Sequence, residues 1–226
     1  HSYSSAASDV YKRQEKMFLN KEGDVLKGLS LNSYLASGVP GTVKGMFKAH
    51  NLFGSIPIEN LIAPAIKIAK DGFTLSNFQA TNFNKYKKKF LNGSDSESIF
   101  IKEGGFKEGD IFIQADLAKS LELIQSRGQK VFYEGKLADK IVEDFSQNGG
   151  LISSEDLFNY KVYLKDPICG IYKEYDVCSM PLPSSGGIAI IQMLNIIENF
   201  DLKNYSHNSL EYIELLMKIM SFAYAD

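Results

Sequence analysis

The sequence predicts an α/β protein that is mostly helical and carries one β-hairpin. Apolar residues recur at helical spacing through most of the 226 residues, which predicts several helices. Apolar and polar residues alternate between Ile168 and Ser179, which predicts paired strands. No segment of about 20 to 50 residues repeats, so a solenoid is excluded.

The first half of the chain predicts two helices and a loop. Pro40 suits the first turn of a helix running toward His50. A second helix should run from about Glu59 to Lys70, with Pro64 near its first turn and Asp71-Gly72 closing it. The segment 92–110 is rich in Gly, Ser, Asp and Glu, so we expect a loop around a short strand at 99–102.

The middle of the chain predicts three further helices. Leu117, Leu121 and Ile124 share one helical face, and a similar pattern runs from Leu137 to Phe145. The second of these helices should end at 148–150, where Asn-Gly-Gly breaks the pattern. A short helix should follow, capped by Ser153 or Ser154.

The last third predicts the hairpin and two apolar helices. The hairpin at 168–179 should turn at Lys173-Glu174, and the turn at 181–187 should lead into a helix at 188–200. That helix is hydrophobic nearly all round, so we expect it to be buried on several sides. A final helix should begin at Leu210, capped by Asn208 or Ser209. Its apolar face is made of Ile213, Leu216, Met217, Met220 and Tyr224.

No linker composition divides the chain, so we interpret 15–226 as one partial domain. Residues 1–14, with the run SSAASDVYKRQ, have neither a hydrophobic period nor a cap, and we interpret them as non-native. The final helix reaches Asp226 without a glycine, a proline or a basic last turn. Both ends are therefore interpreted as cuts.

Charge and hydropathy exclude two classes of partner. The net charge is −2, which gives no field for nucleic acid or an anionic membrane. The basic run Lys85–Lys89 around Tyr86 is typical of a solvated helix face. No stretch approaches the ~20 apolar residues that span a bilayer, so we expect no membrane segment.

Ser184, Ser185, Gly186 and Gly187 form the segment most suggestive of chemistry. Paired serines and glycines before a helix offer free N–H groups at the positive end of its dipole, which suits an anion or an oxyanion. The alternative is structural: Ser184 caps the helix and the glycines allow a tight turn. Both interpretations stay open.

The two cysteines are placed by the predicted hairpin. If Lys173-Glu174 is a two-residue turn, Cys169 lies opposite Cys178, and opposed Cα atoms ~4.5–5.5 Å apart are within disulfide range. A disulfide suits an exported protein. Two reduced thiols packed as small apolar side chains are the alternative.

The sequence contains none of the other common catalytic or cofactor-binding motifs. The sequence has no P-loop, no dinucleotide-binding glycines, no H-E-x-x-H, no C-x-x-C and no G-x-S-x-G. His50 and His207 have no acidic neighbours at ligand spacing, so we expect no metal. No organic cofactor is expected either.

Six segments in order resemble the γ-glutamyltransferase (glutathione hydrolase) family. The sequence at 37–45 is similar to the family's SGxPGTVxG, 64–73 to PAxxxAxxGF, and 114–121 to QxxLAxTL. Residues 132–135 with 149–153 resemble FYxG…GGxxT, with Ser153 where threonine is usual. The segment 180–188 resembles PPPSSGG, with Leu182 in place of a proline, and 223–226 matches the start of AYADR.

The resemblance implies part of an N-terminal nucleophile hydrolase with an αββα sandwich, this chain being a portion of its large subunit. In that family the precursor cuts itself and exposes a threonine that attacks the γ-glutamyl carbonyl, with its own α-amino group as base. The acyl group then passes to water, an amino acid or a peptide. The threonine lies beyond Asp226, and the arginine that binds the donor's carboxylate lies before the matched region. Neither Arg13 nor Arg127 takes that arginine's place, so no catalytic residue is carried over.

The resemblance further implies a partner, a substrate and a location. The partner is the enzyme's own small subunit, the substrates are glutathione and other γ-glutamyl compounds, and the location is periplasmic or extracellular. Ser184 to Gly187 are expected at the pocket margin. The alternatives are a related acylase (cephalosporin-acylase-like or poly-γ-glutamate-processing) and a non-catalytic homologue that acts as a scaffold. This chain alone is expected to be inactive and poorly soluble, because it should expose the face that packs on the small subunit.

Overall fold

The computed structural model describes residues 2–4, 16–90 and 97–225, and the chain divides into two compact units. The larger unit takes the described residues of 11–37 and 46–159, and the smaller those of 1–10, 38–45 and 160–226. No linker marks these boundaries in the sequence, because each unit is assembled from separate segments of ordinary composition. Most of the proposed non-native segment, including His1 and Arg13, lies outside the described residues.

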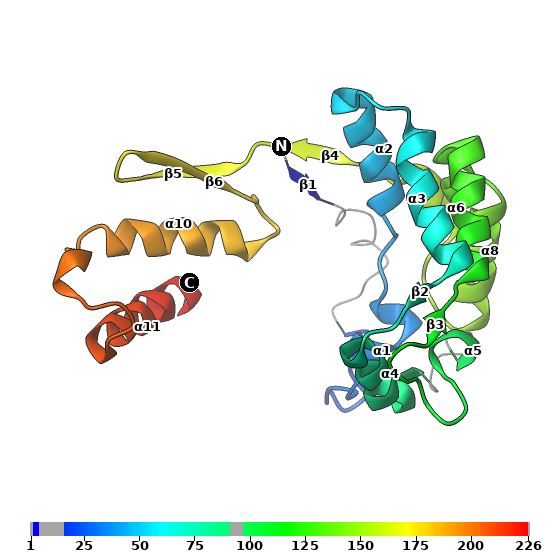
Figure 1. Cartoon of the computed structure of the whole chain (residues 1–226), viewed down its shortest axis with the longest axis horizontal. Helices are drawn as coiled ribbons and strands as arrows, with labels where there is room; N and C mark the ends of the chain where they lie inside the picture. Colours follow the sequence, from blue (N-terminus) through cyan, green and yellow to red (C-terminus); the bar gives the residue numbers. More distant parts are fainter. Residues whose placement is uncertain (1, 5–15, 91–96, 226) are drawn as a thin grey trace. The chain divides into compact units, whose positions relative to one another are not determined.

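The larger unit is a layer of helices with one short strand pair (Figure 1). Its elements are α1 (Leu29–Asn32), η1 (Tyr34–Ala36), α3 (Ile58–Asp71), β2 (Phe73–Thr74), α4 (Asn77–Phe90), α5 (Glu97–Phe100), β3 (Ile111–Phe112), α6 (Ala115–Arg127), α7 (Lys130–Tyr133), α8 (Lys136–Gln147) and α9 (Ser154–Asn159). Helix α2 (Thr42–Phe53) begins two residues after Pro40, and the boundary between the two units falls within it, after Gly45. Helix α3 packs along α6, and α7 contacts both α6 and α8. The predicted helices of this region are therefore present.

Helix α3 ends where predicted, but its proline lies in the middle of the helix and not near the first turn. Gly72, at φ 81°, takes the C-cap position and donates its N–H to the Ile68 carbonyl. Pro64 is inside the helix, the seventh residue of Ile58–Asp71, so its predicted place near the first turn is wrong. Proline has no N–H, and the Asn60 carbonyl therefore receives no bond from it.

The predicted strand at 99–102 is also wrong, because Glu97–Phe100 forms the short helix α5. Phe100 belongs to a cluster of phenylalanine rings, with ring centroids 5.0 Å from Phe90, 5.7 Å from Phe83 and 5.7 Å from Phe112. Aromatic pairs at these distances add stabilisation beyond burial. This packing of distant residues overrides the local preference of Ile99 for a strand.

The smaller unit consists of a hairpin, two helices and a short strand pair. Its elements are β1 (Ser2–Ser4), β4 (Tyr163–Lys165), β5 (Ile168–Tyr172), β6 (Tyr175–Ser179), α10 (Ser185–Ile197), η2 (Leu202–Asn204) and α11 (Leu210–Ala225). Strands β5 and β6 pair antiparallel, with Tyr172 opposite Tyr175, which confirms the predicted turn and register. Helix α10 packs on this hairpin and α11 packs on α10.

Helix α11 is covered on a side other than its predicted apolar face. Ser209 caps it, since the Tyr212 N–H donates to Ser209 Oγ at 3.2 Å. The buried residues are Leu215, Ile219 and Ala223. The predicted apolar face is present on this helix, and four of its five residues, Ile213, Met217, Met220 and Tyr224, are exposed. The helix is apolar on both sides, and the periodicity does not tell which side is covered.

Within the described ranges, none of the helices combines the length and the apolar character needed to cross a bilayer. The fold class is as predicted: mostly helical, with a β-hairpin.

Candidate functional site

The turn Ser184–Gly187 consists of the N-cap and the first helical residues of α10, which follows the hairpin. Ser184 takes the N-cap position with an extended backbone (φ −75°, ψ 121°), and its N–H donates to the Pro181 carbonyl at 3.2 Å. Its side chain makes no capping hydrogen bond, so the backbone alone sets the start of the helix. Ser185 and Gly186 are exposed and Gly187 is buried.

The two glycines of this turn have different surroundings: Gly187 is crowded and Gly186 is not. A Cβ on Gly187 would lie 2.1 Å from the Met180 carbonyl oxygen and 2.8 Å from Ile168 Cγ2, so no side chain fits there. A Cβ on Gly186 would meet only Ser184 Oγ, at 3.7 Å. Gly187 therefore allows the helix to approach the hairpin, and Gly186 leaves the start of the helix open to solvent.

A lysine holds the chain just before the turn. Lys165 Nζ, from the end of β4, donates to the Leu182 carbonyl at 2.7 Å. This bond ties the turn to β4, which precedes the hairpin in sequence. The serine hydroxyls and the open start of α10 are thus held on a framework made of β4, β5 and β6.

The turn can offer hydrogen bonds and a partial positive charge. The first N–H groups of a helix have no intrahelical acceptor and favour anions. The turn contains no base or acid, so by itself it activates no nucleophile. The turn can therefore bind an anion, but it cannot catalyse a reaction by itself.

The cysteines lie in the hairpin that supports this turn. Cys169 of β5 is opposite Cys178 of β6, as predicted, with their Cα atoms 4.2 Å apart. Their sulfurs are joined in a disulfide, so of the two alternatives the structure contains the bonded one.

The two histidines and Arg127 belong to other segments of the chain. His50 contacts the Ile56 carbonyl through Nε2 at 2.7 Å, and His207 contacts Asn208. Arg127 is in the last turn of α6. Over the described ranges no three His, Cys, Asp or Glu side chains gather in a way that could hold a metal ion.

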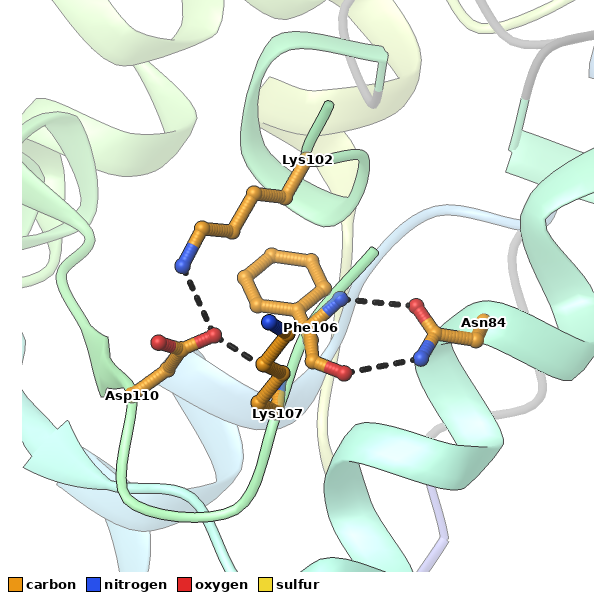
Figure 2. A network of polar contacts seen from close by, with 5 residues as sticks. All are labelled: Asn84, Lys102, Phe106, Lys107 and Asp110. Carbon is orange, nitrogen blue, oxygen red and sulfur yellow. Dashed lines mark hydrogen bonds and ion pairs between the residues drawn. The ribbon is translucent and has the colours of Figure 1, made fainter. Parts of the chain in front are cut away.

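A polar network in the larger unit escaped the sequence analysis. Figure 2 shows the Asn84 side chain facing the main chain of Phe106: its Oδ1 accepts from the Phe106 N–H at 2.8 Å and its Nδ2 donates to the Phe106 carbonyl at 2.9 Å. Asp110 accepts the Lys107 N–H at 2.8 Å and pairs with Lys102 at 2.7 Å. The Lys102 hydrogen bond, followed by that of Lys107, lowers the pKa of the Asp110 carboxyl. This network closes the loop at 101–110 and is structural.

The other clearly shifted carboxyls are also at the surface. Hydrogen bonds from Lys67 and Lys119 lower the pKa of Asp71 and Asp116 respectively. A backbone hydrogen bond at its own N–H, and then one from Ser209, lowers the pKa of Glu211. Each is an ordinary surface or helix-cap interaction.

Comparison with known proteins shows which family shares this arrangement. Residues 6–226 match the family model described as gamma-glutamyltranspeptidase. The chain is 44% identical to a glutathione hydrolase proenzyme of Escherichia coli K12 over 217 residues, which cover 95% of this chain and 37% of that relative. It is also 32% identical over 209 residues to an acylase ACY 1 proenzyme of Pseudomonas sp. SE83, covering 92% of this chain and 38% of that relative.

A solved structure has the same fold. The gamma-glutamyltranspeptidase of Helicobacter pylori superimposes with a TM-score of 0.91 at 42% identity, covering 95% of this chain and 62% of that one. The chain thus spans little more than a third of the length of the curated relatives it matches.

Proposed function

This chain belongs to the gamma-glutamyltranspeptidase family, and on that premise we propose that the whole protein is a γ-glutamyltransferase and glutathione hydrolase. It cleaves γ-glutamyl amide bonds and passes the γ-glutamyl group to water, an amino acid or a peptide. The observation that carries this proposal is the 44% identity to a glutathione hydrolase proenzyme along 95% of the chain.

In this proposal the chain supports the active site and helps to bind the substrate, but it does not supply the attacking group. The attacking threonine, which forms the acyl-enzyme, lies outside the chain. The turn Ser184–Gly187 lies at the margin of the substrate pocket, where the exposed start of α10 offers N–H groups to an anionic part of the substrate. Lys165 and the hairpin keep that turn in place.

The partner in this proposal is the protein's own small subunit, released when the precursor is cleaved. Several relatives are named proenzymes, a term for precursors that are cut to become active. The exposed apolar side of α11, defined by Leu210, Ile213, Met217, Met220 and Tyr224, suits such a partner. None of these five residues lines the surface pocket of about 360 Å³ between α10 and α11, which is formed in part by Phe200, Leu215 and Phe222.

The location in this proposal is outside the cytoplasm, in the periplasm or the extracellular medium. The hairpin disulfide supports it, because disulfides form and persist in oxidising compartments and are rare in the cytosol.

One comparison of substrates tests the activity. The full-length protein is assayed with a γ-glutamyl chromogenic donor and with a glutaryl amide. Preference for the γ-glutamyl donor is the expected result. Preference for the glutaryl amide would instead favour an acylase, the alternative that the 32% identity to acylase ACY 1 keeps open.

Two further measurements separate an enzyme from a scaffold. We expect the reading frame beyond Asp226 to encode a threonine at the cleavage position, and a frame without it would leave only a scaffold. The purified chain of 226 residues should not turn over the γ-glutamyl donor, because the proposed attacking threonine lies outside it. Turnover by this chain alone would show that the attacking group is in this chain, contrary to the proposal.

A further inference from the structure

The hairpin presents its disulfide on the face turned away from helix α10. Cys169 and Cys178 are both exposed. The next residue, Gly170, faces the helix, since a Cβ there would lie 2.8 Å from Ile191 Cγ2. Side chains alternate between the two faces of a strand, so one face of the hairpin packs on α10 and the other carries the disulfide. The disulfide therefore lies on the exposed face of the hairpin.

The same hairpin positions the turn Ser184–Gly187. Ile168 pairs with Ser179 at the open end of the hairpin, one residue beyond the disulfide. Ile168 and Met180 are also the two residues against which Gly187 packs. If the pairing of β5 and β6 weakens at this end, Ile168 and Met180 can shift. Because Gly187 packs against both residues, its position should shift with them.

We propose that the Cys169–Cys178 disulfide is a thiol-exchange site for small thiol peptides and that its reduction loosens the turn Ser184–Gly187. The effect on substrate binding rests on the proposed function, but the exchange itself does not. A substrate class that includes glutathione carries the reacting thiol. An abundant thiol substrate would thereby reduce the affinity of its own enzyme for the γ-glutamyl donor.

The exchange balances with two thiols for each disulfide. The thiolate of one peptide attacks a hairpin sulfur, forms a mixed disulfide and releases the other cysteine as a thiolate, which takes up a proton. A second peptide thiolate attacks the peptide sulfur of the mixed disulfide and releases the remaining cysteine. The two peptide thiols are oxidised to one peptide disulfide, and two electrons reduce Cys169–Cys178 to the dithiol.

The removal of this link has a physical consequence for the hairpin. A disulfide stabilises mainly by restricting the alternative conformations of the segment it closes, here the residues between positions 169 and 178. An isolated two-stranded hairpin is marginally stable. Without the link the hairpin depends on its packing against α10, and we expect its open end to fluctuate more.

The first experiment measures exchange without any need for turnover. The chain is incubated with millimolar reduced glutathione, quenched with acid and analysed by intact mass. We expect a species that carries one glutathione and then the fully reduced chain. The Cys169→Ser/Cys178→Ser variant should show neither. If the folded disulfide stays intact at a thiol dose that reduces the urea-unfolded chain, the proposal is overturned.

The second experiment follows the turn. Hydrogen exchange of the amides at 184–187 should be at least about threefold faster in the reduced chain than in the oxidised one. The α3 helix of the other unit serves as the internal control and should not change. Equal exchange at 184–187 in the two redox states would refute the coupling to the turn.

The third experiment uses the full-length protein. Reduction should raise KM for the γ-glutamyl donor by about threefold with kcat little changed, because the nucleophile is elsewhere. The double serine variant should have the higher KM and ignore added thiol. An unchanged KM would overturn the regulatory step. Absence of turnover in both redox states would count against the proposed function, while the mass and hydrogen-exchange results would still decide the exchange.

Discussion

The two units of this chain use their apolar residues in opposite ways. In the larger unit Leu75, Tyr133 and Leu157 are at most 2% exposed, and the exposed apolar residues are spread over several elements. In the smaller unit Met217, Phe222 and Tyr224 are 65% or more exposed, and all three lie on α11. Scattered exposed apolar residues are normal, whereas a concentration on one element indicates an interaction surface. The larger unit covers its own core, and the smaller one has a surface that suits a partner.

The largest expected effect is a truncation in the core of the larger unit. Leu157→Ala should lower the free energy of unfolding by about 3 kcal/mol, because Leu157 is fully buried and its removal leaves a cavity. Urea unfolding of the chain measures the difference. Met217→Ala is the matched control in the smaller unit, and should stay within about 0.5 kcal/mol. A similar loss in both variants would remove the contrast between the units.

The same Met217→Ala variant sharpens the comparison in the full-length protein. If a partner subunit covers α11, the substitution should cost about 2 kcal/mol there although it costs almost nothing in this chain. Unfolding of the two proteins under the same conditions gives the comparison. An equally neutral result in both would show that this side of α11 stays exposed.

The next effect concerns the glycines that join hairpin and helix. Gly187→Ala should destabilise the chain by about 2 kcal/mol, since its Cβ would lie 2.1 Å from the Met180 carbonyl oxygen. Gly186→Ala is the control one residue away. It meets nothing closer than 3.7 Å and should change the free energy of unfolding by less than about 1 kcal/mol. Equal losses would mean that the helix does not need this close approach.

These predictions depend on features that the sequence reveals to very different degrees. The hairpin was predicted down to the pairing of Cys169 with Cys178, because strand period and turn length together determine the register. Ser153 was among the predicted caps, and its hydroxyl donates to Asp156 at 2.6 Å. The candidate segment was predicted as part of the turn before a helix starting at Ile188, but α10 begins at Ser185, so three of its four residues lie inside the helix.

The missed features depend on contacts between distant residues. The Asn84 bonds to Phe106 span 22 residues and follow no periodic pattern. Helix α5 exists where a strand was expected because Phe100 packs among rings from other segments. The covered side of α11 depends on which neighbour is present, and local sequence does not contain that information.

A smaller change in stability is expected for substitutions of the serines at two helix starts, one in each unit. Ser153→Ala should cost about 1 kcal/mol, because the Ser153 hydroxyl donates to the buried Asp156 carboxylate and accepts the Asp156 N–H. Ser184→Ala should be close to neutral, because its side chain makes no capping bond. Thermal unfolding distinguishes them. If Ser184→Ala leaves stability unchanged but raises KM in the full-length protein, its hydroxyl acts in the pocket; a loss of stability would make it structural.

The smallest effect is the pH dependence of the network in Figure 2. Lys102 and Lys107 lower the pKa of Asp110 in the folded chain, so the carboxylate stabilises the fold above the unfolded pKa of about 4 and stops doing so as pH falls through the lower folded value. Asp110→Asn should therefore reduce the urea midpoint at pH 7, and the difference from the unchanged chain should shrink below about pH 4. Because the carboxylate and its lysine partner are accessible to solvent, added salt should also reduce the difference. Glu108→Gln, in the same loop, is the control. A difference that is constant from neutral to acid pH would show that Asp110 acts through its shape and hydrogen bonds, independent of its charge.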